Sequence, residues 1–263
     1  MKKPYRYPHS HKDGIEKQVA EMLQAKLIKH SCSPYASPVL LVKKKDNTWY
    51  FCVDYRHLND ITLKDRYPIP NIDKLLGELY RAKCFTKIDL RLRCHQIRVK
   101  VVDTYKTTFQ THQGHCEFLV IPFGLTNASA TFQALMNQVF GSFRRKFVLV
   151  FFYDILVYRP TLPGHVEHLR QVLIVLKENS LFAKFSKYSF AQRRVEYLGH
   201  GISNQGVTMD SSKVECIMTW RTPKTAKKLR KFLGLTRYHR CFIKGSGTIY
   251  KSLTSLLQKD TFT

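Results

Sequence analysis

Apolar residues recur along the chain at two different spacings, and their order predicts a fold of alternating helices and strands. Residues 13–30 carry apolar side chains three or four positions apart, which is the spacing of one buried helix face. That face consists of Ile15, Val19, Met22 and Leu23. Residues 37–60 follow as two apolar strands joined by a turn around Asp46 and Asn47, so a hairpin is predicted after the first helix.

The middle of the chain predicts three more helices. A short helix follows the prolines of 68–70, on the apolar positions Ile72, Leu75, Leu76 and Leu79. The clearest helix lies within 126–143, where Asn127 or Ser129 can cap the start and Gly141 ends it. Its apolar stripe consists of Phe132, Leu135, Met136, Val139 and Phe140. The last helix, within 165–180, is expected to direct Leu169, Val172, Leu173 and Leu176 inward.

Strand patterns separate these helices. Phe85, Lys87 and Asp89 alternate as a strand does, 147–160 is an almost unbroken apolar run, and 194–203 is strand-like. The order of strand, helix, strand pair and helix predicts an α+β fold, with an antiparallel sheet covered on one face by two helices.

The charge of the chain indicates its partner. Among 263 residues, 44 Lys and Arg stand against 19 Asp and Glu, a formal charge of +25 that favours a bound polyanion. Nucleic acid is the leading partner. An anionic membrane surface is the weaker alternative, because no apolar stretch is long enough to span a bilayer and the basic residues are spread along the chain. The N-terminus lacks the apolar core of a signal peptide, so we expect an intracellular protein.

Cysteine and histidine positions argue against a disulfide framework or a zinc site. The seven cysteines are odd in number and contain no CxxC pair, and an intracellular protein keeps such residues as reduced thiols. The histidines are scattered, and His115 and His200 lack ligand spacing, so structural roles are expected for both.

The C-terminal part differs in composition from the rest. Residues 221–251 contain ten Lys and Arg and no acid, with Leu229, Phe232 and Leu233 at helical spacing. A solvated basic helix is one reading. A helix laid along a nucleic-acid backbone is the other, because Tyr238 and Phe242 interleave with the charge.

One acid, Asp154, interrupts the apolar run of 147–160. Asp suits turns, because its side chain can hydrogen-bond nearby backbone, and this is the structural interpretation. A functional carboxylate is the alternative.

A series of stretches matches the motifs of one known family in order and spacing. They read SPYASPVLLVKKKDNTWYFCVDYRHLN, YPIPNIDKLL, FTKIDL, HQIRV, FGLTNASATFQALMN, DILVY, VEYLGHGIS and LRKFLGLTRYHRCFIKG. The chain thus resembles the reverse transcriptase of gypsy-type LTR retrotransposons, of plant elements most of all. The resemblance implies a right-hand polymerase with fingers (1–63 and 99–122), a palm (64–98 and 123–205) and the start of a thumb (206–263). We expect none of the 263 residues to belong to the ribonuclease H or integrase modules of such polyproteins.

The resemblance also implies the metal chemistry. In this family two Mg²⁺ ions, for which Mn²⁺ can substitute, clamp the reacting phosphate and are held by palm carboxylates. Asp89 matches one of these acids, and the backbone carbonyl of Leu90 matches a further ligand. Asp154 matches the second acid of an adjacent Asp pair, but the first position of that pair is Tyr153 here. A phenol does not replace a carboxylate as a Mg²⁺ ligand near neutral pH, so this copy is expected to be catalytically impaired.

Nucleotide-site positions carried over from the family are Lys44, Arg93, Cys94, Phe123 and Gly124. Lys44 matches a lysine that neutralises the incoming deoxynucleoside triphosphate. Cys94 replaces the aromatic residue that excludes a 2′-hydroxyl, and Arg93 replaces a glycine. Both changes are expected to disturb nucleotide selection. Contact with an RNA or DNA template-primer is expected from Lys43, Lys45, Arg56, Lys227, Lys228, Arg230 and Lys231.

Three interpretations stay open at this stage. The chain is an RNA-directed DNA polymerase domain by descent with little activity, a catalytically inactive module that still binds nucleic acid, or a degenerate product that folds poorly.

Overall fold

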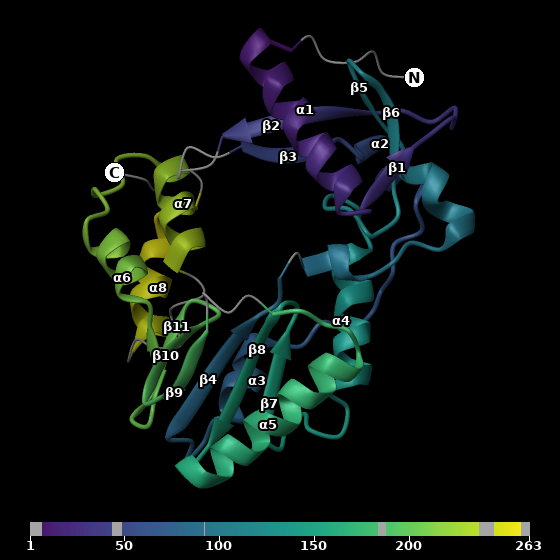
Figure 1. Cartoon of the computed structure of the whole chain (residues 1–263). Coiled ribbons are helices and arrows are strands. Elements are labelled where there is room, and N and C mark those ends of the chain that lie inside the picture. The colour runs from purple at the N-terminus through teal and green to yellow at the C-terminus, as the bar shows by residue number, and fades with distance from the viewer. Residues whose placement is uncertain (1–6, 44–48, 92, 184–187, 237–244, 259–263) are drawn as a thin grey trace.

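A computed structural model of the chain describes residues 7–43, 49–91, 93–183, 188–236 and 245–258 (Figure 1). Figure 1 shows three groups of elements that follow one another around a C-shaped molecule. The first group surrounds a five-stranded sheet, the second a four-stranded sheet, and the third a three-stranded sheet with the last helices. The α+β expectation is confirmed.

The five-stranded sheet is built from two distant parts of the sequence. Its order is β1-β6-β5-β2-β3, where β2 and β3 form the predicted hairpin and β2 also runs parallel to β5. The strands are β1 (Ile28–His30), β2 (Ser37–Lys43), β3 (Trp49–Val53), β5 (Phe109–Thr111) and β6 (Gly114–Phe118). Helix α1 (His9–Gln24) packs Ile15 and Val19 against this sheet, as its apolar spacing predicts. The short helix α2 (Arg56–Ile61) and the 3₁₀ helix η2 (Val101–Thr107) flank it.

A buried carboxylate ties η2 to this sheet. Glu117 on β6 is 5% exposed and accepts hydrogen bonds from Ser31 Oγ at 2.6 Å and Thr104 Oγ1 at 2.9 Å. It also lies 3.0 Å from Lys29 Nζ. Burial alone raises the pKa of this carboxyl, but the hydrogen bonds and the lysine outweigh burial and hold its pKa below the ordinary value of 4.5.

We therefore expect the Glu117 carboxylate to stabilise the fold at neutral pH and to lose that contribution in acid. Because its folded pKa is depressed, the contribution is complete above about pH 4.5 and disappears as the pH falls through the lower folded value. Urea unfolding measured from pH 6 to pH 3 should show a decline in the free energy of unfolding that is shallower in Glu117→Gln. An equal pH slope in the variant and the unaltered chain would contradict this role.

The four-stranded sheet carries most of the core. Its order is β7-β8-β4-β9, all antiparallel, with β4 (Cys84–Asp89), β7 (Val148–Phe151), β8 (Asp154–Arg159) and β9 (Ser189–Gln192). Side chains alternate between its faces. Val148, Val150, Ile155 and Val157 pack with α4 (Ala128–Val139) and α5 (Leu162–Glu178), which confirms an antiparallel sheet with two helices on one face.

The opposite face of this sheet is covered as well, which the sequence pattern does not predict. Leu149, Leu156 and Tyr158 pack against α3 (Ile72–Gly77) and a three-stranded sheet. That sheet consists of β10 (Arg194–Tyr197), β11 (His200–Ser203) and β12 (Gly206–Met209). The expected boundary at residue 205 falls between β11 and β12, inside one sheet.

The C-terminal group contains α6 (Ser211–Met218), α7 (Ala226–Thr236) and α8 (Ser246–Ser255). Helix α7 buries Leu229 and Leu233, as its spacing predicts, and leaves its basic side chains exposed. Tyr238 and Phe242 lie outside the described residues. Within the described ranges, no helix combines the length and the apolar character that crossing a bilayer requires.

Two local predictions were wrong. Leu173 is 40% exposed and does not point inward, because the buried face of α5 narrows to Val172 and Leu176, with Leu169 half-buried. Asn127 occupies the N-cap position of α4, but its side chain does not cap the helix. It accepts from Asp65 N and donates to Leu63 O, and so pins the loop after α2.

Candidate active site

Two acids meet at the end of the four-stranded sheet. Asp89 is the last residue of β4 and Asp154 the first of β8, and the two are direct partners in the antiparallel register. Side chains of directly opposed residues lie on the same face of a sheet, so both carboxylates belong to one site. Lys87 Nζ lies 3.9 Å from Asp154 Oδ1, and the Asp154 side chain is 35% exposed. The acid of the apolar run is thus half-buried at a strand end, which suits a carboxylate that must reach solvent and ligand.

The turn that presents Asp154 is held from two sides. β7 and β8 are joined by Phe152 and Tyr153 alone, and Phe152 adopts a φ of 49°, the left-handed conformation that favours glycine. Its backbone N–H donates to Gln133 Oε1 of α4 at 2.8 Å. The buried Tyr197 hydroxyl donates to the carbonyl of Asp154 at 3.2 Å. Packing therefore fixes a strained turn at the point where the acids meet.

Tyr153 lies against the core of the four-stranded sheet, and its hydroxyl contacts Cys94. The Tyr153 Oη–Cys94 Sγ distance is 2.9 Å, and the Tyr153 ring packs on Phe132 with centroids 4.8 Å apart. Cys94, in the 3₁₀ helix η1 (Arg93–Gln96), is 1% exposed. Two of the positions at which the chain departs from the resembled family therefore contact one another. Tyr153 thus occupies the space between Cys94 and Phe132.

The residues at this site do not fit a complete pair of divalent ions. Among the described residues, no three His, Cys, Asp or Glu side chains gather where they could hold a metal. Asp89 and Asp154 supply two carboxylates, and the position beside them carries a phenol engaged with Cys94. Hard divalent cations bind oxygen ligands such as carboxylates. Two carboxylates are too few to hold two such ions between them. The carbonyl expected as a ligand belongs to Leu90, whose backbone N–H donates to the carbonyl oxygen of Tyr153 at 3.2 Å.

Two of the residues expected in the nucleotide pocket, Phe123 and Gly124, are described by the structure. Phe123 is half-buried, with its ring centroid 4.8 Å from His95 and 6.0 Å from Tyr50. Burial lowers the pKa of His95 to about 4, so this ring is neutral at pH 7. Gly124 has a φ of 96°, and its carbonyl accepts from Asn59 Nδ2 at 2.7 Å. An aromatic cluster and a glycine with positive φ therefore occur at these positions, and their role in nucleotide binding stays a prediction.

The remaining expected cations are only partly described. Lys44, Lys45 and the side chain of Arg93 lie outside the described residues. Lys43 ends β2 with an exposed side chain. Arg56 donates to Asp54 from Nε at 2.8 Å and from Nη2 at 2.7 Å, a bidentate pair that fixes its guanidinium beside α2. On α7, the exposed basic side chains are Lys227, Lys228, Arg230 and Lys231.

Sequence reasoning missed the residues that position the turn. Gln133 is fully buried on α4 and also donates to Asn137 Oδ1 at 3.0 Å. A signal was present, because a glutamine three positions before Met136 shares a helix face with the apolar stripe and must find buried partners there. Tyr197 offered no comparable signal, since its partner is a backbone carbonyl more than 40 residues away.

The sheet, the flanking helices and the acid-bearing hairpin define the palm of a right-hand polymerase. Comparison with known proteins agrees. The sequence profile of the family described as "Reverse transcriptase (RNA-dependent DNA polymerase)" matches residues 42–202. The chain belongs to this reverse transcriptase family, and its relatives place it with the reverse transcriptase domains of LTR retrotransposons. Members of the family generally use divalent metal ions.

Two of the relatives are Pol-type polyproteins. The retrovirus-related Pol polyprotein from transposon 297 of Drosophila melanogaster is 40% identical over 98% of this chain. The transposon Tf2-3 polyprotein of Schizosaccharomyces pombe is 34% identical over 97% of it. The chain spans only 25% and 19% of the lengths of these two proteins.

Solved structures show the same fold. A foamy viral protease-reverse transcriptase in complex with double-stranded DNA superposes with a TM-score of 0.88 at 23% identity. It covers 97% of this chain and 45% of its own. A foamy viral protease-reverse transcriptase in complex with an RNA/DNA hybrid gives a TM-score of 0.83, also at 23% identity, over 97% of this chain and 34% of its own.

Proposed function

We propose that the chain is the reverse transcriptase domain of a gypsy-type polyprotein that binds an RNA or DNA template-primer but has lost most of its nucleotidyl transfer. The observation that carries this proposal is the register pair of Asp89 and Asp154 beside a phenol at position 153. The fold and the paired acids belong to a polymerase, whereas the third carboxylate is missing. Deoxynucleoside triphosphates and Mg²⁺ or Mn²⁺ are the substrates and ions of the ancestral reaction.

The parts of the chain take the following roles in this proposal. The five-stranded sheet with α1 and α2 forms the fingers (1–63 and 99–122), the four-stranded sheet with α4 and α5 forms the palm (64–98 and 123–205), and α6 to α8 form the start of the thumb (206–263). Asp89 and Asp154 are the remaining metal-facing acids. Phe123 and Gly124 line the nucleotide pocket next to Cys94.

Template-primer binding depends on charge that the fold leaves exposed. The basic side chains of α7 project away from the buried Leu229 and Leu233, and the whole chain carries a formal charge of +25. Contact between lysine or arginine and phosphate releases bound counterions, so affinity falls as salt rises. Binding without efficient extension is the combination expected of this domain.

Removing two α7 charges tests the nucleic-acid contact. Lys227→Gln with Lys228→Gln is expected to weaken binding of an RNA/DNA hybrid about tenfold at moderate salt and to lower the slope of log affinity against log salt by roughly one per lost phosphate contact. Fluorescence anisotropy over a series of salt concentrations measures both. Arg170→Gln with Lys177→Gln removes the same charge from exposed positions of α5 and serves as the matched control.

Different results would contradict the two parts of the proposal, which are nucleic-acid binding by α7 and the loss of catalysis. An α7 variant that binds like the α5 variant would contradict the thumb contact and leave the palm assignment intact. Efficient primer extension by the unaltered chain would contradict the loss of catalysis instead.

A further inference from the structure

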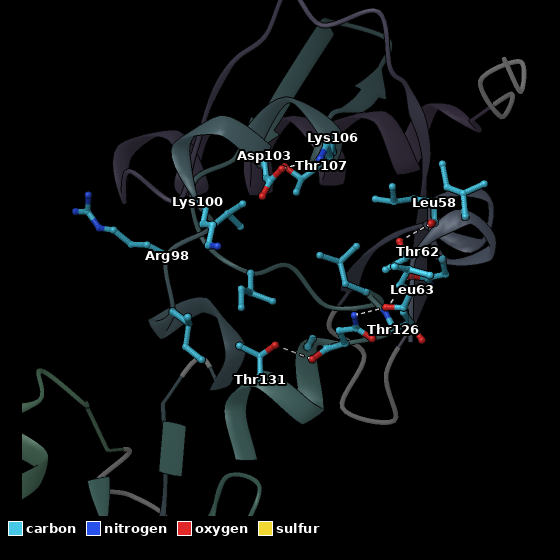
Figure 2. Close-up of a pocket in the computed structure, with 18 of the residues that line it drawn as sticks. Leu58, Thr62, Leu63, Arg98, Lys100, Asp103, Lys106, Thr107, Thr126 and Thr131 are labelled. Carbon is cyan, nitrogen blue, oxygen red and sulfur yellow. Dashed lines mark hydrogen bonds and ion pairs between the residues drawn. The ribbon is translucent and has the colours of Figure 1, made fainter. Parts of the chain in front are cut away.

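A pocket of about 660 Å³ lies apart from the paired acids, between the first sheet group and α4 (Figure 2). Its walls come from α2 and the loop after it, from residues 97–100, from η2, and from the start of α4. None of the residues proposed above for metal, nucleotide or template contact lines it. Its size is that of a pocket that accepts a drug-sized molecule or a few side chains.

The interior of this pocket offers an occupant mainly apolar surface. Leu58, Ile97, Val99, Ile121 and Leu125 contribute apolar surface to it. Four of the uncharged polar side chains in its wall already donate hydrogen bonds within the chain. Asn59 donates to Gly124 O, Thr62 to Leu58 O, Asn127 to Leu63 O and Thr131 to Asn127 O. An occupant therefore gains most by burying apolar surface.

The lip of the pocket is apolar and open to solvent. Leu63 is 91% exposed and Ile61 is 68% exposed, and both line the pocket. Val101, which directly follows the lining residue Lys100, is 85% exposed. A small molecule inside the pocket would leave these side chains in water, whereas a polypeptide lying across the lip would cover them. Exposed apolar surface beside a pocket is typical of a protein-interaction site.

Two cations at the rim are available to a partner. Figure 2 shows Arg98 and Lys100 on one side of the pocket, and both side chains are exposed. Within the part of the chain that the structure describes, neither forms an ion pair, whereas Lys106 is held by Asp103 at 2.6 Å. A partner with carboxylates beside its apolar anchor complements this rim.

A nucleobase fits the pocket less well than such a peptide. Sequence-tolerant base binding relies on aromatic side chains as stacking platforms. The described lining contains one aromatic residue, Tyr35, and its ring already packs on Tyr105 with centroids 5.6 Å apart. The amide groups that could read a base edge are used within the chain.

We propose that this pocket docks a peptide segment of a protein partner, with a bulky apolar side chain in the pocket and acidic residues next to it on Arg98 and Lys100. The remainder of the peptide segment packs on Ile61 and Leu63 at the lip. The site is independent of the polymerase proposal, because it shares no residue with the acids, the nucleotide pocket or α7.

A display selection tests the proposal with the full chain. A random dodecapeptide library is selected in about 0.3 M salt, where exposed charges act only over short distances, and the enriched peptides are measured by anisotropy. We expect the enriched peptides to combine Leu, Ile, Phe or Trp with neighbouring Asp or Glu. Their dissociation constants should rise about tenfold for Arg98→Gln with Lys100→Gln, and about tenfold for Ile61→Ser with Leu63→Ser.

Controls on α5 separate the site from the overall positive charge. Arg170→Gln with Lys177→Gln and Leu162→Ser with Val166→Ser make the same changes at exposed positions of that helix and should leave affinity within about twofold. Thermal melts check that each variant folds. The proposal is overturned if no peptide is enriched, if control and pocket variants weaken binding equally, or if single-stranded oligo(dT) displaces the peptides and itself needs Arg98 and Lys100.

Discussion

Primer extension should increase about a thousandfold when Tyr153→Asp, Cys94→Tyr and Arg93→Gly are combined, because a missing carboxylate in such a site removes several kcal/mol of transition-state stabilisation. The measurement is incorporation on a poly(rA) template with an oligo(dT) primer, in Mg²⁺ and in Mn²⁺. Tyr153→Asp places an acid beside Asp154, the register partner of Asp89, and is expected to supply the third carboxylate of the proposed site.

The contact between Tyr153 and Cys94 predicts that the single change restores less than the combination. Removing the Tyr153 ring leaves space beside Cys94 and Phe132, and unfilled core space is destabilising. Cys94→Tyr fills that space from the other side. The activities of Tyr153→Asp and Cys94→Tyr should therefore combine more than multiplicatively, as expected for residues in contact.

A neutral variant of equal size separates charge from shape. Tyr153→Asn with the same two companion changes should stay inactive, because an amide is a poor substitute for a bridging carboxylate. Template-primer affinity should be similar in all of these variants. Equal activity of the Asn and Asp variants would contradict the role assigned to position 153.

Phe132→Ala should lower the free energy of unfolding by about 3–5 kcal/mol, the usual cost of emptying a fully buried aromatic site. Phe132 on α4 is 0% exposed and packs in the core under β7 and β8. It also supports the ring of Tyr153. Urea unfolding followed by circular dichroism measures the loss, and a domain of ordinary stability will be partly unfolded at 37 °C after it.

Phe182→Ala provides the comparison for this change. The same side chain is removed, but Phe182 is 66% exposed, so the effect should stay within about 0.5 kcal/mol. If the two variants unfold alike, then the core under the hairpin is not the source of stability that its burial indicates.

The sequence predicts the elements that bury one clear face. The stripes of Ile15 and Val19 on α1 and of Phe132 and Met136 on α4 are buried as their spacing requires. It does less well where partners lie far apart along the chain. The parallel pairing of β2 with β5 joins segments about 70 residues apart, and no local pattern encodes it.

In the candidate site, too, the sequence predicts local motifs but not the contacts between distant residues. Asp89 and Asp154 were predicted from motifs, and their register pairing brings them together. The contact between Tyr153 and Cys94 was not predicted, because sequence reasoning treated each substitution as a separate loss. Only the structure shows that these two substituted side chains lie in contact.

The acids of this palm stand at strand ends, whereas the residues that hold the sheets together lie deeper, at Ile88, Ile155 and Phe132. Folding and chemistry therefore depend on different side chains. At the turn itself, the Tyr153 ring packs against this core. If the proposed function holds, such a domain stays folded after its catalysis is lost, and it then competes for the templates that active copies use.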